Sequence, residues 1–137
     1  MIEIHALFLD DNKNRHMRFR EVNTDLRRIH VYDADSCIEE LLDVEKDFDI
    51  IYLDHDLNAE TNNQLNDDEK DGRYVCKRMT KDDIKSRYSG TLVVIHSLNS
   101  VGAKEMSYIL RDAGYEHIVI APFAWESHGR SKLQHWI

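Results

Sequence analysis

Short runs of apolar residues recur along this sequence, and a segment of mixed polar and apolar character separates each run from the next. The runs cover residues 4–9, 29–32, 48–53, 92–95 and 118–121. Runs of this length with few polar interruptions are typical of strands that are buried on both faces, as in a parallel sheet. An alternation of such strands with helices predicts a parallel sheet covered by helices on both sides.

Four segments between the runs have the spacing of amphipathic helices. Ser36 followed by Glu39 is a capping-box pattern, which predicts the start of the second helix. An apolar stripe over residues 106–113 predicts the fourth helix. Weaker patterns over 17–22 and 75–79 predict the first and third helices. The predicted fold is a flavodoxin-like three-layer α/β sandwich with five parallel strands in the order 2-1-3-4-5.

Length and composition narrow the class of protein. The 137 residues suit one domain, which we expect to span residues 1–137. The formal net charge is -8, with 18 basic against 26 acidic residues, and it disfavours a broad nucleic-acid-binding surface. No apolar run approaches the roughly 20 residues of a membrane helix. The N-terminus lacks the basic start of a signal peptide. We therefore expect a cytoplasmic protein in which Cys37 and Cys76 are reduced core residues.

One segment interrupts the pattern of strands and helices. Residues 58–71 (NAETNNQLNDDEKD) contain five acidic residues and only two apolar ones. A segment of this composition buries little apolar surface, which predicts an exposed, solvated loop inserted into the domain. The alternative interpretation is a flap over a site at the end of the third strand.

Three of the predicted strands end in polar residues suited to chemistry. These residues are Asp10 and Asp11 after the first strand, Asp54, His55 and Asp56 after the third, and His96 and Ser97 after the fourth. Ligands of open α/β sheets bind outside the carboxyl ends of the strands, where the strand order reverses. The three groups are therefore expected to converge on one pocket.

The carboxylates of this pocket predict a cation. Asp10, Asp11, Asp54 and Asp56 would repel one another unless a positive ion joined them, and Mg²⁺ or another hard divalent ion is the natural partner of oxygen ligands. Simpler interpretations stay open for single residues. Asp11 would also suit the cap of the next helix, and His96 would also suit a hydrogen-bonded place in the core.

Four segments of the sequence carry a resemblance to a known family. The acid pair in LDD (residues 9–11), Asp54, and the DG at 71–72 resemble the pattern of response-regulator receiver domains. Ala121 stands where receivers carry a lysine that pairs with the phosphoryl group. With LDHDL at 53–57 and HSLNSVGA at 96–103, the chain resembles the receiver-like domains described as cyclic-phosphate processing, over residues from about 4 to 123.

This resemblance implies a metal-assisted phosphoesterase that acts on a cyclic phosphate of a nucleotide or of an ADP-ribose derivative. Asp10, Asp11, Asp54 and Asp56 are the expected ligands of Mg²⁺, while His55 and His96, beside Asp54, are expected to act in catalysis by exchanging protons. A separate set of residues is expected to bind the phosphate: Ser97, Asn99, Gly102 with the neighbouring amides of its helix, and Arg15. The expected partner is a small phosphorylated nucleotide-like ligand.

Two other functions remain open from the sequence. The chain also fits a catalytically inactive receiver-like module that binds a nucleotide or a protein partner. A phospho-accepting receiver is the third possibility, with Asp54 as its acceptor. The oligomeric state is left open, and residues 125–137 are expected to form either a short helix packed on the domain or a contact face.

Overall fold

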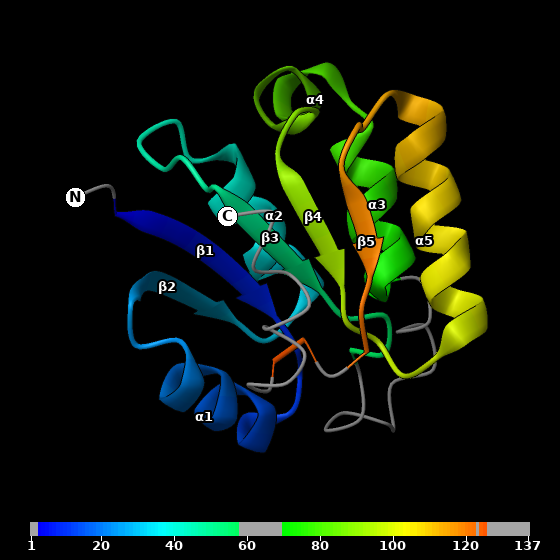
Figure 1. Ribbon diagram of the computed structural model, residues 1–137. Helices are drawn as coiled ribbons and strands as arrows, with labels where there is room; N and C mark the ends of the chain where they lie inside the picture. The colour runs from blue at the N-terminus through cyan, green and yellow to red at the C-terminus, as the bar shows by residue number, and fades with distance from the viewer. Residues whose placement is uncertain (1–2, 58–69, 123, 126–137) are drawn as a thin grey trace.

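The computed structural model describes residues 3–57, 70–122 and 124–125. Its centre is a five-stranded parallel sheet in the order β2-β1-β3-β4-β5 (Figure 1), which confirms the predicted fold and strand order. The strands are β1 (Ile4–Leu9), β2 (Leu26–Val31), β3 (Ile50–Leu53), β4 (Leu92–Ile95) and β5 (Ile118–Ile120). The central strands β3 and β4 are buried at every position, because helices or other segments cover both of their faces.

The described helices lie on both faces of this sheet. They are α1 (Lys13–Val22), α2 (Ala34–Leu42), α3 (Gly72–Met79), α4 (Asp82–Tyr88) and α5 (Ser100–Ala113). Apolar side chains of α2, α3, α4 and α5 form one core with one face of the sheet, around Leu9, Leu53 and Ile95. On the other face, Phe19 of α1 packs with Phe8. No described helix is long and apolar enough to cross a bilayer.

The helix α4 was not predicted from the sequence. Its seven residues, DDIKSRY, contain only Ile84 and Tyr88 as large apolar residues, and this pair is too short a pattern to indicate a helix. Both side chains are fully buried against the core beside α2 and α3. Tertiary packing therefore stabilises a helix whose own sequence is weakly amphipathic.

Several element boundaries also differ from the prediction. The strand β2 begins at Leu26 rather than at residue 29, because an edge strand tolerates exposed charged residues such as Arg27. The helix α2 begins at Ala34, and the Asp33 carboxylate accepts a hydrogen bond from the Ser36 amide at 2.8 Å. Asp33, and not Ser36, is thus the N-cap. Most of the acidic segment at 58–71, and residues 126–137, fall outside the described residues.

The register of the sheet brings the ends of three adjacent strands together. Phe8 of β1 pairs with Tyr52 of β3, and Leu53 of β3 pairs with Ile95 of β4. Carried past the strand ends, the same register places Asp10, Asp54 and His96 opposite one another. The fold thereby collects residues that are far apart in the sequence at one sheet edge.

Candidate functional site

Two carboxylates and one imidazole form a compact buried group at the carboxyl edge of the sheet. One ligand atom from each of Asp10, Asp54 and His96 lies within 4.8 Å of the others. All three residues are buried, with exposed fractions of 0%, 2% and 1%. Of the residues predicted as metal ligands, Asp11 and Asp56 are not part of this group, although both lie in the described part of the chain.

The ring of His96 has a defined orientation and tautomer. Its Nε2 lies 3.0 Å from the carbonyl oxygen of Leu9, which can only accept, so Nε2 carries the hydrogen. The ring stacks on Phe8 with centroids 4.9 Å apart. The lone pair of Nδ1 therefore faces Asp10, whose Oδ2 is 3.7 Å away. Burial lowers the pKa of His96 to about 4, which makes it a poor proton carrier near neutral pH.

The carboxyl group of Asp54 is unusually hard to ionise. Burial, together with the neighbouring charge of Asp10, raises the pKa of Asp54 to about 8. Its Oδ2 is enclosed and has no hydrogen-bond partner among the residues that the structure describes. A carboxylate in such surroundings is stabilised by a proton or by a cation.

Arg15 of α1 reaches into this group of acids. Its Nη1 lies 3.3 Å from Asp10 Oδ2 and 3.6 Å from Asp54 Oδ2, and its guanidinium is 5.9 Å from the centre of the Trp125 ring. The structure thus places Arg15 at the predicted site. Arg18, one turn along the same helix, instead pairs with Glu21 on the surface.

The shifted carboxyl group leads to a pH-dependent stability. Folded protein without metal keeps the Asp54 proton up to about pH 8, whereas the unfolded chain loses it near pH 4, so this group makes stability fall as pH rises between these values. His96 and His30, with pKa values lowered to about 4, oppose that fall only below about pH 6.5.

We therefore expect the free energy of unfolding in the presence of a chelator to fall by about 1–2 kcal/mol between pH 6.5 and 8. Urea titrations across this range would measure it. Asp54→Asn removes the titrating group and should flatten the curve. Equal slopes in the two proteins would contradict the assignment of the proton to Asp54.

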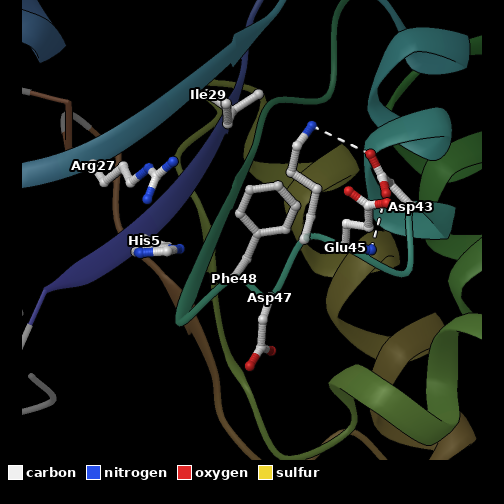
Figure 2. A pocket seen from close by; sticks show the side chains of 8 residues that line it. His5, Arg27, Ile29, Asp43, Glu45, Asp47 and Phe48 are labelled. Carbon is white, nitrogen blue, oxygen red and sulfur yellow. Dashed lines mark hydrogen bonds and ion pairs between the residues drawn. The ribbon is translucent and has the colours of Figure 1, made fainter.

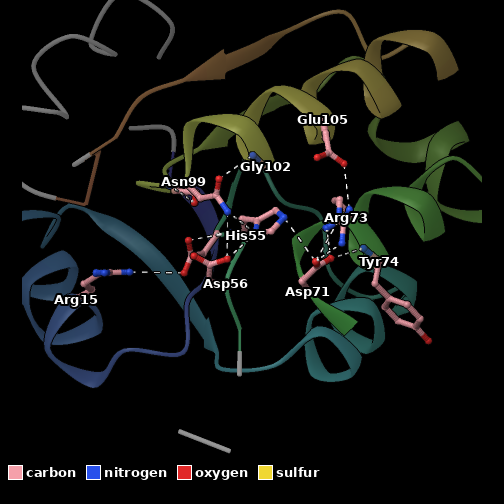
Figure 3. Close-up of polar contacts among 11 residues, drawn as sticks. Arg15, His55, Asp56, Asp71, Arg73, Tyr74, Asn99, Gly102 and Glu105 are labelled. Carbon is pink, nitrogen blue, oxygen red and sulfur yellow. Dashed lines mark hydrogen bonds and ion pairs between the residues drawn. The ribbon is translucent and has the colours of Figure 1, made fainter. Parts of the chain in front are cut away.

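His55 belongs to a second polar network, directed away from Arg15 (Figure 3). Its Nδ1 lies 2.6 Å from Asp56 Oδ1, and its Nε2 is 3.6 Å from Asp71 Oδ2. Arg73 continues the network, because it pairs with Asp71 at 3.0 Å and with Glu105 at 3.1 Å, joining α3 to α5. The ring nitrogens of His55 and His96 are therefore held by different partners, Asp56 and Asp71 for His55 and the Leu9 carbonyl for His96.

The orientation of His55 depends on a glycine in the first turn of α5. A Cβ atom at Gly102 would lie 2.4 Å from Cδ2 of the His55 ring. The Gly102 amide, predicted to bind phosphate, donates instead to Asn99 Oδ1 at 2.9 Å. The ring of His55 therefore fills the space beside Gly102, and the Gly102 amide is bonded to the N-cap residue Asn99.

Ser97 and Asn99 form the entry to α5. Ser97 is buried, and its Oγ accepts a hydrogen bond from the Asn99 amide at 3.0 Å. The side chain of Asn99 caps the helix, and its Nδ2 lies 3.5 Å from Asp56 Oδ1. Both residues lie at the carboxyl edge of the sheet, next to the network of His55.

Sequence reasoning missed the structural roles of two residues of this region. Asp71 was placed in the solvated loop, but it is buried and caps α3 through the amides of Arg73 and Tyr74. His16 was set aside as a residue in polar surroundings, yet it is buried and donates from Nε2 to the Asp10 carbonyl at 2.7 Å. Its Nδ1 lies 2.6 Å from Nδ1 of His30. Only the Asp-Gly pair at 71–72 gave a signal, as the start of a helix.

A hollow at the opposite edge of the sheet is a weaker candidate (Figure 2). It has a volume of about 290 Å³ and lies between His5, Arg27 and Phe48. Its charges are of both signs, and Lys46 already pairs with Glu40 and Asp43. These contacts indicate a surface held by its own ion pairs rather than a ligand site.

A comparison with protein families finds one match, to the family described as "Cyclic-phosphate processing Receiver domain", over residues 5–112. The matched region contains Asp10, Arg15, Asp54, His55 and His96. A comparison with curated protein sequences finds no match.

Solved structures of receiver domains share the fold. The chemotaxis response regulator CheY4 of Vibrio cholerae superposes with a TM-score of 0.69 at 13% identity, covering 99% of this chain and 100% of that one. The signal receiver domain of a putative LuxO repressor protein from Vibrio parahaemolyticus gives 0.63 at 18%, covering 98% and 90%. The Mn²⁺-bound form of the response regulator Rcp1 gives 0.63 at 17%, covering 97% and 94%. At sequence identities this low, these structures show only that the fold is shared.

Proposed function

Because the chain belongs to the cyclic-phosphate processing receiver domain family, we propose that it is a metal-assisted phosphoesterase that opens a cyclic phosphate on a nucleotide or on an ADP-ribose derivative. The observation that carries this proposal is the buried group of Asp10, Asp54 and His96 beside the guanidinium of Arg15. The receiver lysine is replaced by Ala121, which removes the amine that serves phosphoryl signalling. A divalent ion also fits the Mn²⁺ found in a relative of the same fold.

Different residues of the site would bind the metal, bind the phosphate and transfer the proton. Asp10, Asp54 and His96 would hold the divalent cation, which offsets the charge of the phosphate oxygens in the transition state. Arg15 binds a further phosphate oxygen through its fork of donors. His55, with Nδ1 held by Asp56, would carry the proton through Nε2. Because Nε2 lies 3.6 Å from Asp71 Oδ2, the ring has to turn from Asp71 to reach the substrate. Water adds to phosphorus and gives up one proton, one P–O bond of the ring breaks, and the released ribose oxygen takes a proton.

The test offers the purified protein 2′,3′-cyclic nucleotides and ADP-ribose cyclic phosphate with Mg²⁺ or Mn²⁺, and follows the phosphorus by NMR. We expect ring opening to a monoester, its loss on chelation, and its return when the ion is restored. No opening of any substrate would overturn the proposal.

Two controls identify the alternatives. Calorimetric binding of the same compounds without turnover would favour the inactive binding module. Incubation with a small phosphodonor and Mg²⁺, followed by intact mass, addresses the phospho-accepting receiver. An adduct present in the wild type and absent from Asp54→Asn would favour that third function.

Arg15 gives a prediction on the phosphate ligand. Arg15→Ala should weaken binding of a cyclic nucleotide by about 10- to 100-fold, because a charge-assisted contact contributes about 1.5–3 kcal/mol. Calorimetry at a fixed metal concentration measures the affinity. Arg18→Ala, on the same helix but paired with Glu21, is the matched control and should bind as the wild type does. Equal affinities of the three proteins would remove Arg15 from the site.

A further inference from the structure

The lone pair of His96 Nδ1 has no hydrogen-bond partner in the described part of the structure, although its side chain is completely enclosed. A buried nitrogen without a partner costs free energy, typically about 1–3 kcal/mol. The ring cannot turn to relieve this cost without losing the Nε2 hydrogen bond to Leu9 and the stacking on Phe8.

The atoms that face Nδ1 carry the same kind of lone pair. Asp10 Oδ2 is 3.7 Å from Nδ1, and Asp54 Oδ2 is equally enclosed and has no hydrogen bond within the described ranges. Arg15 offsets the charge of the two carboxylates, but among the described residues it donates no hydrogen bond to His96. Three electron-pair donors, from Asp10, Asp54 and His96, thus meet at the ends of three strands. A cation bound between them would accept an electron pair from each.

We propose that His96 is a metal ligand through Nδ1, so that the pocket selects a first-row transition-metal ion such as Mn²⁺, Co²⁺ or Zn²⁺ over Mg²⁺. Mg²⁺ favours oxygen ligands, whereas imidazole nitrogen suits the transition metals. The backbone carbonyl of Leu9 fixes the tautomer from the opposite ring nitrogen, which is the arrangement of most metal-bound histidines.

This inference concerns the same pocket as the proposed function, but it is tested by binding and not by turnover. Calorimetry with Co²⁺ and with Mg²⁺ should show tighter binding of Co²⁺ to the wild type. His96→Ala should weaken Co²⁺ binding by at least about tenfold and change Mg²⁺ binding much less. His5→Ala, at the opposite edge of the sheet, is the matched control and should keep the wild-type ratio of affinities.

Because His96 is buried, its alanine variant risks misfolding, so a second measurement uses the unaltered chain. In ¹⁵N-labelled protein, saturation with Zn²⁺ should shift the Nδ1 resonance of His96 and leave Nε2 protonated. An unchanged Nδ1 resonance at metal saturation, or an equal preference for Co²⁺ and Mg²⁺ in the wild type, overturns the inference. A shifted resonance in a protein that opens no cyclic phosphate would leave the metal site standing and remove only the enzymatic function.

Discussion

His55→Ala should lower the rate of cyclic-phosphate opening by about 10²- to 10⁴-fold, the usual cost of removing a general acid or base. Metal affinity should stay unchanged, because the ring of His55 points to Asp71 and not into the group of Asp10, Asp54 and His96. His55→Asn sharpens the test, since its amide retains a donor toward Asp56 but lacks Nε2. If Nε2 exchanges the proton, both variants lose activity alike.

The metal dependence of turnover distinguishes the two histidines. Activity lost in His96→Ala should return in part as the metal concentration rises, because that variant binds the ion weakly. Activity lost in His55→Ala should not return. His117→Ala, which alters a half-exposed ring away from the site, is the control for changes in histidine content. Full turnover in His55→Ala would contradict a catalytic role for this residue.

Gly72→Ala should destabilise the protein by about 3 kcal/mol, at the upper end of the range for overpacking. A Cβ at this position would lie 2.3 Å from the Asp54 carbonyl oxygen and 2.8 Å from His55 Cα, both of which belong to the backbone. Gly72 also donates from its amide to the His55 carbonyl at 2.7 Å. The clash therefore moves the two residues that follow β3.

Urea unfolding at pH 7 would measure this effect. Gly90→Ala is the matched control, since no atom lies within 4 Å of the added Cβ, and its stability should stay within about 0.5 kcal/mol of the wild type. A Gly72→Ala protein as stable as this control would mean that the segment after β3 is free to move, and that its side chains are not fixed by α3.

The parts predicted correctly from sequence are those set by burial and topology. The apolar runs at 4–9 and 92–95 predict strands buried on both faces, and the predicted strand order is that of flavodoxin-like doubly wound sheets. This order predicts that Asp10, Asp54 and His96 lie at one edge of the sheet. The short helix α4 was missed because its stability comes from contacts that its own seven residues do not reveal.

The direction in which each side chain points could not be predicted from the sequence. The LDHDL segment predicted His55 near Asp54, but its ring is turned by the space above Gly102 and by Asp71, which lie in other elements. His16 was overlooked because its role depends on reaching the Asp10 carbonyl from the next helix. Spacing along the chain indicates which residues share an edge, while the packing of neighbouring helices decides where each ring points.

The three electron-pair donors at positions 10, 54 and 96 meet only when β1, β3 and β4 are paired. An ion held by all three therefore binds the folded chain and not the unfolded one. By mass action, each tenfold rise in free ion above its dissociation constant adds about 1.4 kcal/mol to the free energy of unfolding. The metal supply of the surroundings would thus set the lifetime of the protein as well as its chemistry, and scarcity would expose it to proteolysis.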